Sequence, residues 1–321
     1  MTGATGFLGS HLIESLVRAG HDVRAIVRPT ADVSGLRHPS IEVIRGELGD
    51  SRAVESAMQD CEIAYHLAAT TSRTGKSRAN SFLTNLEYTK NVSLAVLRQQ
   101  VRRLVVCSTA AVYGVVDDPP VDEESPTKEN SPYAESKLAA ERYLSETYRD
   151  QGLPVVVARF PGVLGRRSLS WVGLFGAIAT GHFRVIGSGD NHTHTCHVDD
   201  ILQGLQLCAI VPNIEGRTYN LASEQPIVVN DFVAMIAAEL RVGISSVRLP
   251  TLPYWVFSQM NAMVYRWLSK ELPYAHKYEL FISDKVMSIA KAQRELGFAP
   301  RVPLVTGIRD TIAWYRETGM L

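Results

Sequence analysis

Several features that mark other classes of protein are missing from this chain of 321 residues. Its formal net charge is zero, which gives no electrostatic reason to expect a nucleic-acid partner or an anionic membrane. No apolar run reaches the roughly 18 residues that a membrane span needs, and no secretory signal is visible. We therefore expect a cytoplasmic protein without an integral membrane span.

Metal-ligating patterns are scarce too. The four cysteines have no paired ligand spacing, and their scatter fits small core residues in a reducing compartment. His192, His194 and His197 lie close in sequence, and alternation along an extended segment places the first two on one face. No carboxylate or cysteine is arranged with them, so we expect no metal site.

The first 160 residues alternate between strand and helix patterns, which predicts a parallel sheet with right-handed crossovers. We predict strands at 22–27, 41–46, 62–69, 102–109 and 153–160, and helices at 51–59, 80–100 and 132–151. Later in the chain we predict helices at 169–180, 197–211, 229–240 and 305–318, and a strand at 217–222. Asp199 or Asp200 is expected to cap the helix at 197–211, and Asn230 the helix at 229–240.

The predicted fold class is α/β, a Rossmann-type doubly wound parallel sheet followed by a smaller C-terminal substrate domain. Residues 1–160, with about 195–222, are assigned to the dinucleotide-binding domain, and 161–194 with 223–321 to the substrate-binding domain.

Gly3, Gly6 and Gly9 form a Gly-x-x-Gly-x-x-Gly turn that opens directly into a helix. Glycines let backbone amides approach a pyrophosphate, and the helix N-terminus adds partial positive charge. The alternative is a loop whose glycines serve turn geometry alone. The hydrophobic strand that should feed this turn is missing or truncated at Met1, so we expect that the true start lies upstream.

Two charged residues bear on the choice of cofactor. Arg28 follows the strand at 22–27, where an acid would bind a ribose 2′-hydroxyl and an arginine accommodates a 2′-phosphate. Arg28 therefore favours NADP, with NAD as the alternative if this arginine is only a solvated surface residue. Glu47, after the next strand, could reach the adenine or equally be a solvated carboxylate.

Tyr133 and Lys137 have the spacing Tyr-x-x-x-Lys, which places both side chains on one face of a helix. A free tyrosine has a pKa of about 10, and an ammonium beside it lowers that pKa. Such a pair can take a proton from a substrate hydroxyl near neutral pH. The spacing also occurs by chance on surface helices, so the rest of the sequence decides.

The motifs TGATGFLG, HLAA (66–69), STAAVYG (108–114) and YAESK (133–137) stand in the order typical of extended short-chain dehydrogenases/reductases. RFPGVLG, HVDD and the tail from SIAKAQRELG also resemble this family, which includes the NAD-dependent epimerases and dehydratases. The similarity extends over nearly the whole chain, and the segment 252–274 resembles the apolar lid region of 3β-hydroxysteroid dehydrogenase-like and dihydroflavonol reductase-like members.

The resemblance implies a role for each matching residue. Tyr133 would be the proton relay, and Lys137 would lower its pKa and bond the nicotinamide ribose. Thr109 matches the Ser/Thr that orients the reacting oxygen, with Ser108 as the fallback. Asn85 matches the asparagine that supports the relay, although it could equally be a helix cap. The residues expected to bind the cofactor are Gly3, Gly6, Phe7, Leu8, Gly9, Arg28, Glu47, Leu48, Leu67, Ala68, Ala69, Ser108, Tyr133, Lys137, Phe160 and Val163.

The sequence departs from the nucleotide-sugar members of the family at two positions. Those enzymes commonly have Asn at the place of Gly162 and Arg at the place of Thr193. Arginine suits the grip of a diphosphate, so its absence weakens that assignment, although Arg166, Arg167 or the nearby histidines could substitute. The segment 252–274 resembles an apolar lid and suits a hydrophobic small-molecule substrate, unless it is a core or membrane-surface helix.

We therefore predict an NAD(P)-dependent oxidoreductase that transfers hydride between nicotinamide and a steroid-like or flavonoid-like secondary alcohol or ketone. The alternatives are a nucleotide-sugar epimerase or dehydratase and, in another class, a non-catalytic dinucleotide sensor. The resemblance also implies a homodimer, formed by the helices at 80–100 and 132–151 in a four-helix bundle.

Overall fold

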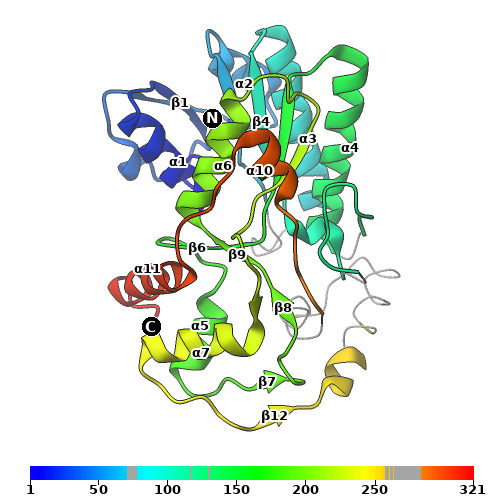
Figure 1. Cartoon of the computed structure of the whole chain (residues 1–321). Helices are drawn as coiled ribbons and strands as arrows, with labels where there is room; N and C mark the ends of the chain where they lie inside the picture. The colour runs from blue at the N-terminus through cyan, green and yellow to red at the C-terminus, as the bar shows by residue number, and fades with distance from the viewer. Residues whose placement is uncertain (71–77, 116–117, 129–130, 257–259, 261–262, 264–282) are drawn as a thin grey trace.

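The computed structural model describes residues 1–70, 78–115, 118–128, 131–256, 260, 263 and 283–321 (Figure 1). A sheet flanked by helices forms the upper part of the molecule in this view, and a smaller part lies below it. The segment predicted as an apolar lid, 252–274, lies mostly outside the described residues. Among the described helices, none has both the length and the apolar character to cross a membrane.

A parallel sheet forms the centre of the upper part. Four strands lie in the order β10–β5–β4–β3, and β1 pairs with β2 beside them. β4 and β5 are buried along their whole length, as expected for strands covered by helices on both faces. The strands are β1 (Val23–Val27), β2 (Ile41–Arg45), β3 (Ile63–His66), β4 (Arg103–Cys107), β5 (Val155–Arg159) and β10 (Thr218–Asn220).

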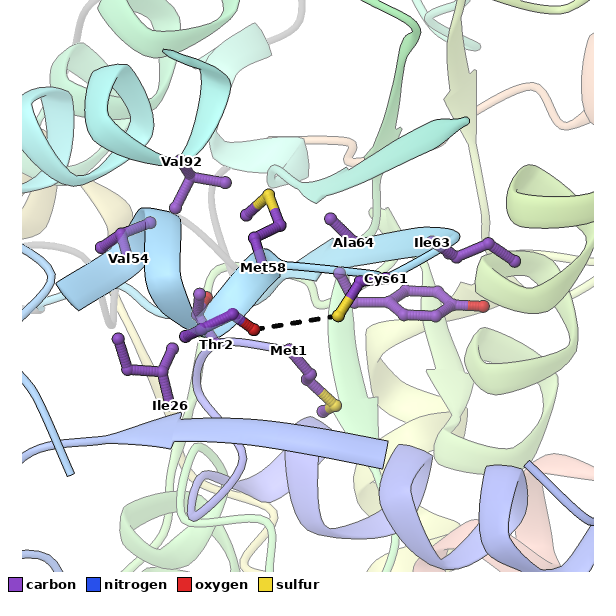
Figure 2. Close-up of a pocket in the computed structure, with 11 residues that line it drawn as sticks. Met1, Thr2, Ile26, Val54, Met58, Cys61, Ile63, Ala64 and Val92 are labelled. Atoms are coloured by element: carbon purple, nitrogen blue, oxygen red, sulfur yellow. Dashed lines mark hydrogen bonds between the residues drawn. The ribbon is translucent and has the colours of Figure 1, made fainter. Parts of the chain in front are cut away.

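Met1 and Thr2 occupy the place of the first, central strand. Thr2 forms parallel bridges to Ile26 of β1 and to His66 of β3, so it joins the two groups of strands. The amide of Thr2 donates to Tyr65 at 2.9 Å, and the carbonyl of Met1 accepts from Ile26 at 3.0 Å. Met1 and Thr2 therefore lie between β1 and β3, where the central strand of such a sheet belongs. Figure 2 shows a small cavity beside them, with a lining that includes Ile26, Val54, Met58 and Val92.

Helices cover both faces of the sheet. α1 (Phe7–Arg18) and α6 (Val198–Ile210) pack together on one face, and α2 (Ser51–Met58), α3 (Arg78–Arg98) and α4 (Pro132–Gln151) lie on the other. The ends of α4 follow from its sequence: the Ser131 hydroxyl accepts from the Ala134 amide, Pro132 begins the helix, and Gly152 ends it with φ +70°. This places Tyr133 and Lys137 in its first two turns.

The smaller part is built from two-stranded sheets and helices. The pairs are β6–β9, β8–β11 and β7–β12, and α5, α7 and α11 enclose a core that includes Phe175, Phe232 and Tyr315. Its elements are β6 (Gly162–Leu164), α5 (Val172–Ala179), β7 (Val185–Ile186), β8 (His192–Thr193), β9 (Thr195–His197), β11 (Ile227–Val228), α7 (Val229–Leu240), β12 (Arg248–Leu249) and α11 (Leu304–Glu317). The described residues also include the short helices η1 (Ser34–Leu36), η3 (Ala110–Tyr113) and α10 (Ala290–Leu296).

Every predicted strand and helix is present, with ends that differ by a few residues, but both predicted helix caps are wrong. His197 caps α6, because its ring accepts from the Asp199 amide while Asp200 accepts from the backbone at Arg301. α7 has no side-chain cap, because Asn230 lies inside its first turn and donates to the Ser188 carbonyl. The division into a dinucleotide-binding and a substrate-binding domain stays a prediction.

Candidate active site at the carboxyl edge of the sheet

The turn between Thr2 and α1 passes so close to other backbone that its glycines are required. Gly3 has φ +74°, and a Cβ there would lie 2.7 Å from the Ala68 nitrogen at the end of β3. A Cβ at Gly9 would lie 2.0 Å from the Gly3 carbonyl oxygen, and one at Gly6 3.2 Å from the same atom. Only a turn without side chains folds back on itself in this way, which lets backbone amides approach a pyrophosphate.

The first turn of α1 fits an anionic group. Its N-cap, Gly6, makes no side-chain capping bond, and the turn holds no acidic residue. The amides of Phe7 and Leu8 precede the first intrahelical bond, which Ser10 donates to Gly6. The residues present at this helix N-terminus therefore fit the diphosphate of a dinucleotide.

The two charged residues predicted to select the cofactor lie at one edge of the sheet. Arg28 directly follows β1 and is exposed, and Glu47 follows β2 and is also exposed. Burial raises the pKa of the Tyr88 phenol; Glu47 raises it further and Arg28 lowers it, so both charges border the same ring. Leu48 is buried, and its carbonyl accepts from the Asn91 side chain at 2.9 Å.

Two further segments predicted to line the cofactor follow other strands of the sheet. Residues 67–69 follow β3, and the Ala68 amide donates to the Thr2 hydroxyl at 3.2 Å. Phe160 follows β5, and its carbonyl accepts from the Ala110 amide at 2.9 Å. Val163 is buried in β6, where the chain enters the smaller part. All of these segments lie at or beyond carboxyl ends of strands, the edge where parallel α/β sheets bind ligands.

Tyr133 and Lys137 face the end of β4 from α4. Lys137 is buried, and its Nζ donates to the Cys107 carbonyl at 2.8 Å. The same Nζ lies 6.0 Å from the centre of the Tyr133 ring. An ammonium has three N–H donors, so this bond leaves two for a ligand.

The two hydroxyls after β4 have different partners. The Ser108 side chain is buried, and its hydroxyl donates to the Glu141 carboxylate. Thr109 is half-buried, and its Oγ1 accepts from the Ala111 amide at 3.2 Å, which caps η3. Accepting this bond leaves the Thr109 O–H group as a donor, whereas that of Ser108 is committed to Glu141.

Asn85 lies inside α3 and is therefore not a helix cap. Its Oδ1 accepts from the Thr70 amide at 2.7 Å, and its Nδ2 donates to the Ser136 hydroxyl at 3.1 Å. Ser136 in turn donates to the Tyr133 carbonyl at 2.8 Å. Asn85 thus fastens the loop after β3 to the first turn of α4 and makes no direct bond to Lys137.

The expectation that Lys137 lowers the pKa of Tyr133 is wrong for the chain alone. Burial raises the pKa of Tyr133 to about 12, and a smaller contribution from Cys107 acts in the same direction. Burial also lowers the pKa of Lys137, while Cys107 and Glu141 oppose that change. The physical reason is that the ammonium bonds the backbone at Cys107 and not the phenol. Tyr133 is therefore protonated at neutral pH and can give a proton away.

A buried ion pair between Glu141 and Arg159 adds two residues that were not among those predicted from the sequence. Arg159 Nη2 lies 2.5 Å from Glu141 Oε2, and the two side chains are only 8% and 10% exposed. Glu141 continues the helical spacing of Tyr133 and Lys137 by one more turn. That spacing, Tyr-x-x-x-Lys-x-x-x-Glu, together with an arginine at the end of a buried strand, is the signal that could have predicted the pair.

The three histidines considered as metal ligands do not converge. His192 Nδ1 lies 3.3 Å from Asp284, whereas the His194 ring accepts from the Met287 amide at 2.9 Å. His197 is used as the cap of α6. Within the described ranges, no three His, Cys, Asp or Glu side chains form a group that could hold a metal ion.

Comparison with known proteins identifies the family. The sequence model of the NAD dependent epimerase/dehydratase family matches residues 1–222. The 3-beta-hydroxysteroid dehydrogenase of Mycolicibacterium neoaurum is 25% identical, over 99% of this chain and 91% of that protein. The dTDP-glucose 4,6-dehydratase of Streptomyces niveus is 27% identical, over 99% of this chain and 92% of that protein.

A solved structure resembles the whole chain. The crystal structure of gox2253 superposes with a TM-score of 0.82 at 28% identity, and the match covers 100% of this chain and 98% of that one. The family match spans more than half of the chain, including the glycine turn, the end of β3 and the Tyr133–Lys137 helix. The chain therefore belongs to the NAD dependent epimerase/dehydratase family, and it is an NAD(P)-dependent enzyme of the extended short-chain dehydrogenase/reductase type.

Proposed function

We propose that this enzyme is a dehydrogenase/reductase that interconverts a hydrophobic secondary alcohol and its ketone. The observation that carries the proposal is the bond from Lys137 to Cys107. This bond joins α4, which carries Tyr133, to the end of β4, which is followed by Thr109. A proton donor and a second hydroxyl are thereby brought to the same edge as the glycine turn.

The chain's own groups account for the proton transfer. The bound dinucleotide supplies or accepts the hydride at its nicotinamide. Tyr133 is protonated at neutral pH, because burial raises its pKa to about 12, so it can give its proton to a carbonyl oxygen as that oxygen gains negative charge. The O–H group of Thr109 donates to the same oxygen and orients it, and Lys137 has donors left for ligand hydroxyls.

The residues around Thr109 support oxidoreduction over dehydration. Elimination of water needs a further acid–base group beside the relay. Ala110 and Ala111, which follow Thr109 in η3, carry none. The nearby carboxylate of Glu141 is bonded to both Arg159 and Ser108.

Packing at Gly162 supports an apolar substrate. A Cβ at Gly162 would lie 2.4 Å from the Trp171 ring, so the indole takes the space of any side chain, including the Asn of nucleotide-sugar enzymes. Thr193, which replaces their arginine, is 3% exposed and uncharged. In place of an amide and a guanidinium, this part of the chain therefore has a buried indole and an uncharged threonine.

The two arginines considered as substitutes for a diphosphate-binding arginine are each paired with a carboxylate. Arg166 lies 2.5 Å from Glu317, and Arg167 lies 2.7 Å from Glu14. The 3-beta-hydroxysteroid dehydrogenase among the relatives gives a precedent for an apolar alcohol.

We propose NADP as the preferred cofactor, with Arg28 facing its 2′-phosphate, and NAD as the alternative.

We propose further that the enzyme is a homodimer that pairs α3 and α4 with their counterparts. The two helices pack side by side, and they expose apolar side chains: Leu83 is 59%, Leu94 36% and Tyr148 37% exposed. Light scattering should then report twice the 35.4 kDa mass of the chain. A monomer at micromolar concentration contradicts this proposal.

Tyr133→Phe tests the function. The variant removes the proton and keeps the ring, so turnover of any accepted ketone should fall about 10²- to 10⁴-fold at unchanged thermal stability. Tyr148→Phe, on the exposed side of the same helix, is the control. The substrates to compare are a 3β-hydroxysteroid, a 2-alkyl-3-oxoacid, dTDP-glucose and UDP-glucose, each with NADP(H) and NAD(H). Undiminished turnover by Tyr133→Phe, or turnover of the sugar nucleotides alone, sinks the assignment.

A further inference from the structure

Helix α4 holds the two residues that directly precede Thr109. Lys137 donates to the carbonyl of Cys107 at 2.8 Å, and the Ser108 hydroxyl donates to the carboxylate of Glu141. These are successive residues at the end of β4. The path of the backbone into Thr109 is therefore set from α4 at two adjacent points.

Arg159 holds the residues that follow Thr109. Its Nη2 lies 2.5 Å from Glu141, and its Nη1 donates to the Tyr113 hydroxyl at 3.0 Å. Tyr113 is the last residue of η3, the short helix that Thr109 caps, and its hydroxyl donates to Asn220 at 2.7 Å. Thr109 is thus bracketed, by Glu141 through Ser108 on one side and by Arg159 through Tyr113 on the other.

Stability alone is a poor reason for this pair. Both side chains are at most 10% exposed, and the desolvation of two buried charges offsets most of their attraction. Apolar residues of similar volume would fill the same space at least as well. The bonds of the pair instead converge on the short segment that carries Thr109.

We propose that Glu141 and Arg159 are positioning residues, which fix the Thr109 hydroxyl relative to the Tyr133 phenol without touching the substrate. This inference rests on the role of Thr109 in the proposed function. It predicts that disturbing the pair lowers kcat while the affinity for the cofactor stays the same.

Arg159→Lys is the main test, and Arg103→Lys is its matched control. A lysine keeps the charge but cannot bond Glu141 and Tyr113 together. Arg103 is also buried and also pairs with a carboxylate, Glu215 at 2.5 Å, but at the other end of β4. Both variants should lose thermal stability. Only Arg159→Lys should lower kcat, by about ten-fold or more, because small misplacements of reacting groups are costly, and its KM for NADPH should stay within about twofold.

A double-mutant cycle separates positioning from general damage. Glu141→Gln and Ser108→Ala should each lower kcat, and the double variant should cost little more than Glu141→Gln alone, because Glu141→Gln disturbs the bond to Ser108 as well as the pair with Arg159. Glu146→Gln, exposed on the same helix, should change nothing. Fully additive losses, or equal kcat losses for Arg159→Lys and Arg103→Lys, overturn the proposal. If Arg159→Lys does not fold, Glu141→Gln and this cycle decide the question.

Crystal structures of the two lysine variants give an answer that needs no substrate. Thr109 should be displaced from its wild-type position relative to Tyr133 in Arg159→Lys and unmoved in Arg103→Lys. An unmoved Thr109 in both variants refutes the positioning role. Failure of the proposed function shows separately, as absence of turnover by the wild-type enzyme.

Discussion

The two ends of strand β4 bury the same chemical pair and use it differently. At the amino end, Arg103 donates to the Cys208 and Val211 carbonyls at 3.0 and 3.1 Å and pairs with Glu215. These carbonyls lie at the C-terminus of α6, where a cation is favourable. At the carboxyl end, the pair of Arg159 with Glu141 bonds side chains on both sides of Thr109.

The difference between Arg103 and Arg159 shows that the role of a buried arginine cannot be inferred from the residue type alone. Both guanidiniums are paired with a carboxylate and make further hydrogen bonds, although the buried Nε of Arg103 has no partner. What separates them is the edge of the sheet, because all parallel strands present their carboxyl ends to the ligand. Arg103 therefore bonds the carbonyls at the end of a helix, whereas Arg159 borders the proposed active site. Four predictions can break or sharpen this contrast.

The largest effect is expected at the carboxyl end. Lys137→Met should lower kcat by about 10³-fold, because the ammonium is lost from beside Tyr133 while the aliphatic volume is kept. The unfolding free energy should change little or rise, since a buried ammonium is costly to desolvate. Turnover and thermal unfolding of the same preparation check both parts. A loss of activity that only follows unfolding would count against a chemical role.

The second effect belongs to the amino end. Arg103→Met should lower the free energy of unfolding by about 2–4 kcal/mol, because two helix-end carbonyls and Glu215 lose their partner. The kcat of the folded variant should equal that of the wild type. Urea unfolding and steady-state kinetics measure the two quantities. A clear fall in kcat would show that the amino end is coupled to the site.

The third effect is a loss of stability at acidic pH, which comes from two buried histidines. Arginine cannot produce it, because arginine stays protonated throughout this pH range. Burial, assisted by the charge of Lys137, lowers the pKa of His66 to about 3, and burial lowers that of His194 to about 4. The unfolded chain binds these protons near pH 6.5, so stability is complete above that pH and falls as the pH drops. Each histidine should cost about 2 kcal/mol at pH 5. Urea unfolding at pH 7.5 and 5 should show a smaller loss for His66→Gln than for the wild type; equal losses would contradict the assignment.

The smallest effect concerns the adenosine edge. Arg28→Ser should raise the KM for NADPH about ten-fold and leave the KM for NADH unchanged. The factor corresponds to the free energy of one charge-assisted hydrogen bond to a phosphate. Arg37→Ser, an exposed arginine that follows η1, is the control. Equal changes for the two cofactors would remove the reason to prefer NADP.

Most of the helices and strands could be predicted from the sequence, but the shortest strands and the helix caps could not. The alternation that gave β1 to β5 is strong because buried parallel strands are continuous apolar runs, such as VVVAR in β5. The two-residue strands β7, β8, β11 and β12 are too short to show any periodicity. The cap of α6 was assigned to an aspartate by propensity, whereas His197 stands at that position.

The candidate site divides in the same way. Gly3, Gly9, Tyr133 and Lys137 stand in local motifs, so their neighbourhood follows from spacing along the chain. Arg159 meets Glu141 only when β5 is placed beside α4, and no spacing in the sequence measures that contact. The pKa of Tyr133 was predicted in the wrong direction for a related reason: the acceptor of Lys137 is a backbone carbonyl 30 residues away.

The position of Thr2 has a consequence for how the molecule responds to a ligand. Its backbone bridges Ile26 of β1 and His66 of β3, and the glycine turn begins at the next residue. A dinucleotide bound at that turn adds contacts beside the residue that joins the two groups of strands, and binding to the native state stabilises it by mass action. Amide hydrogen exchange at Ile26 should therefore slow when the dinucleotide is added.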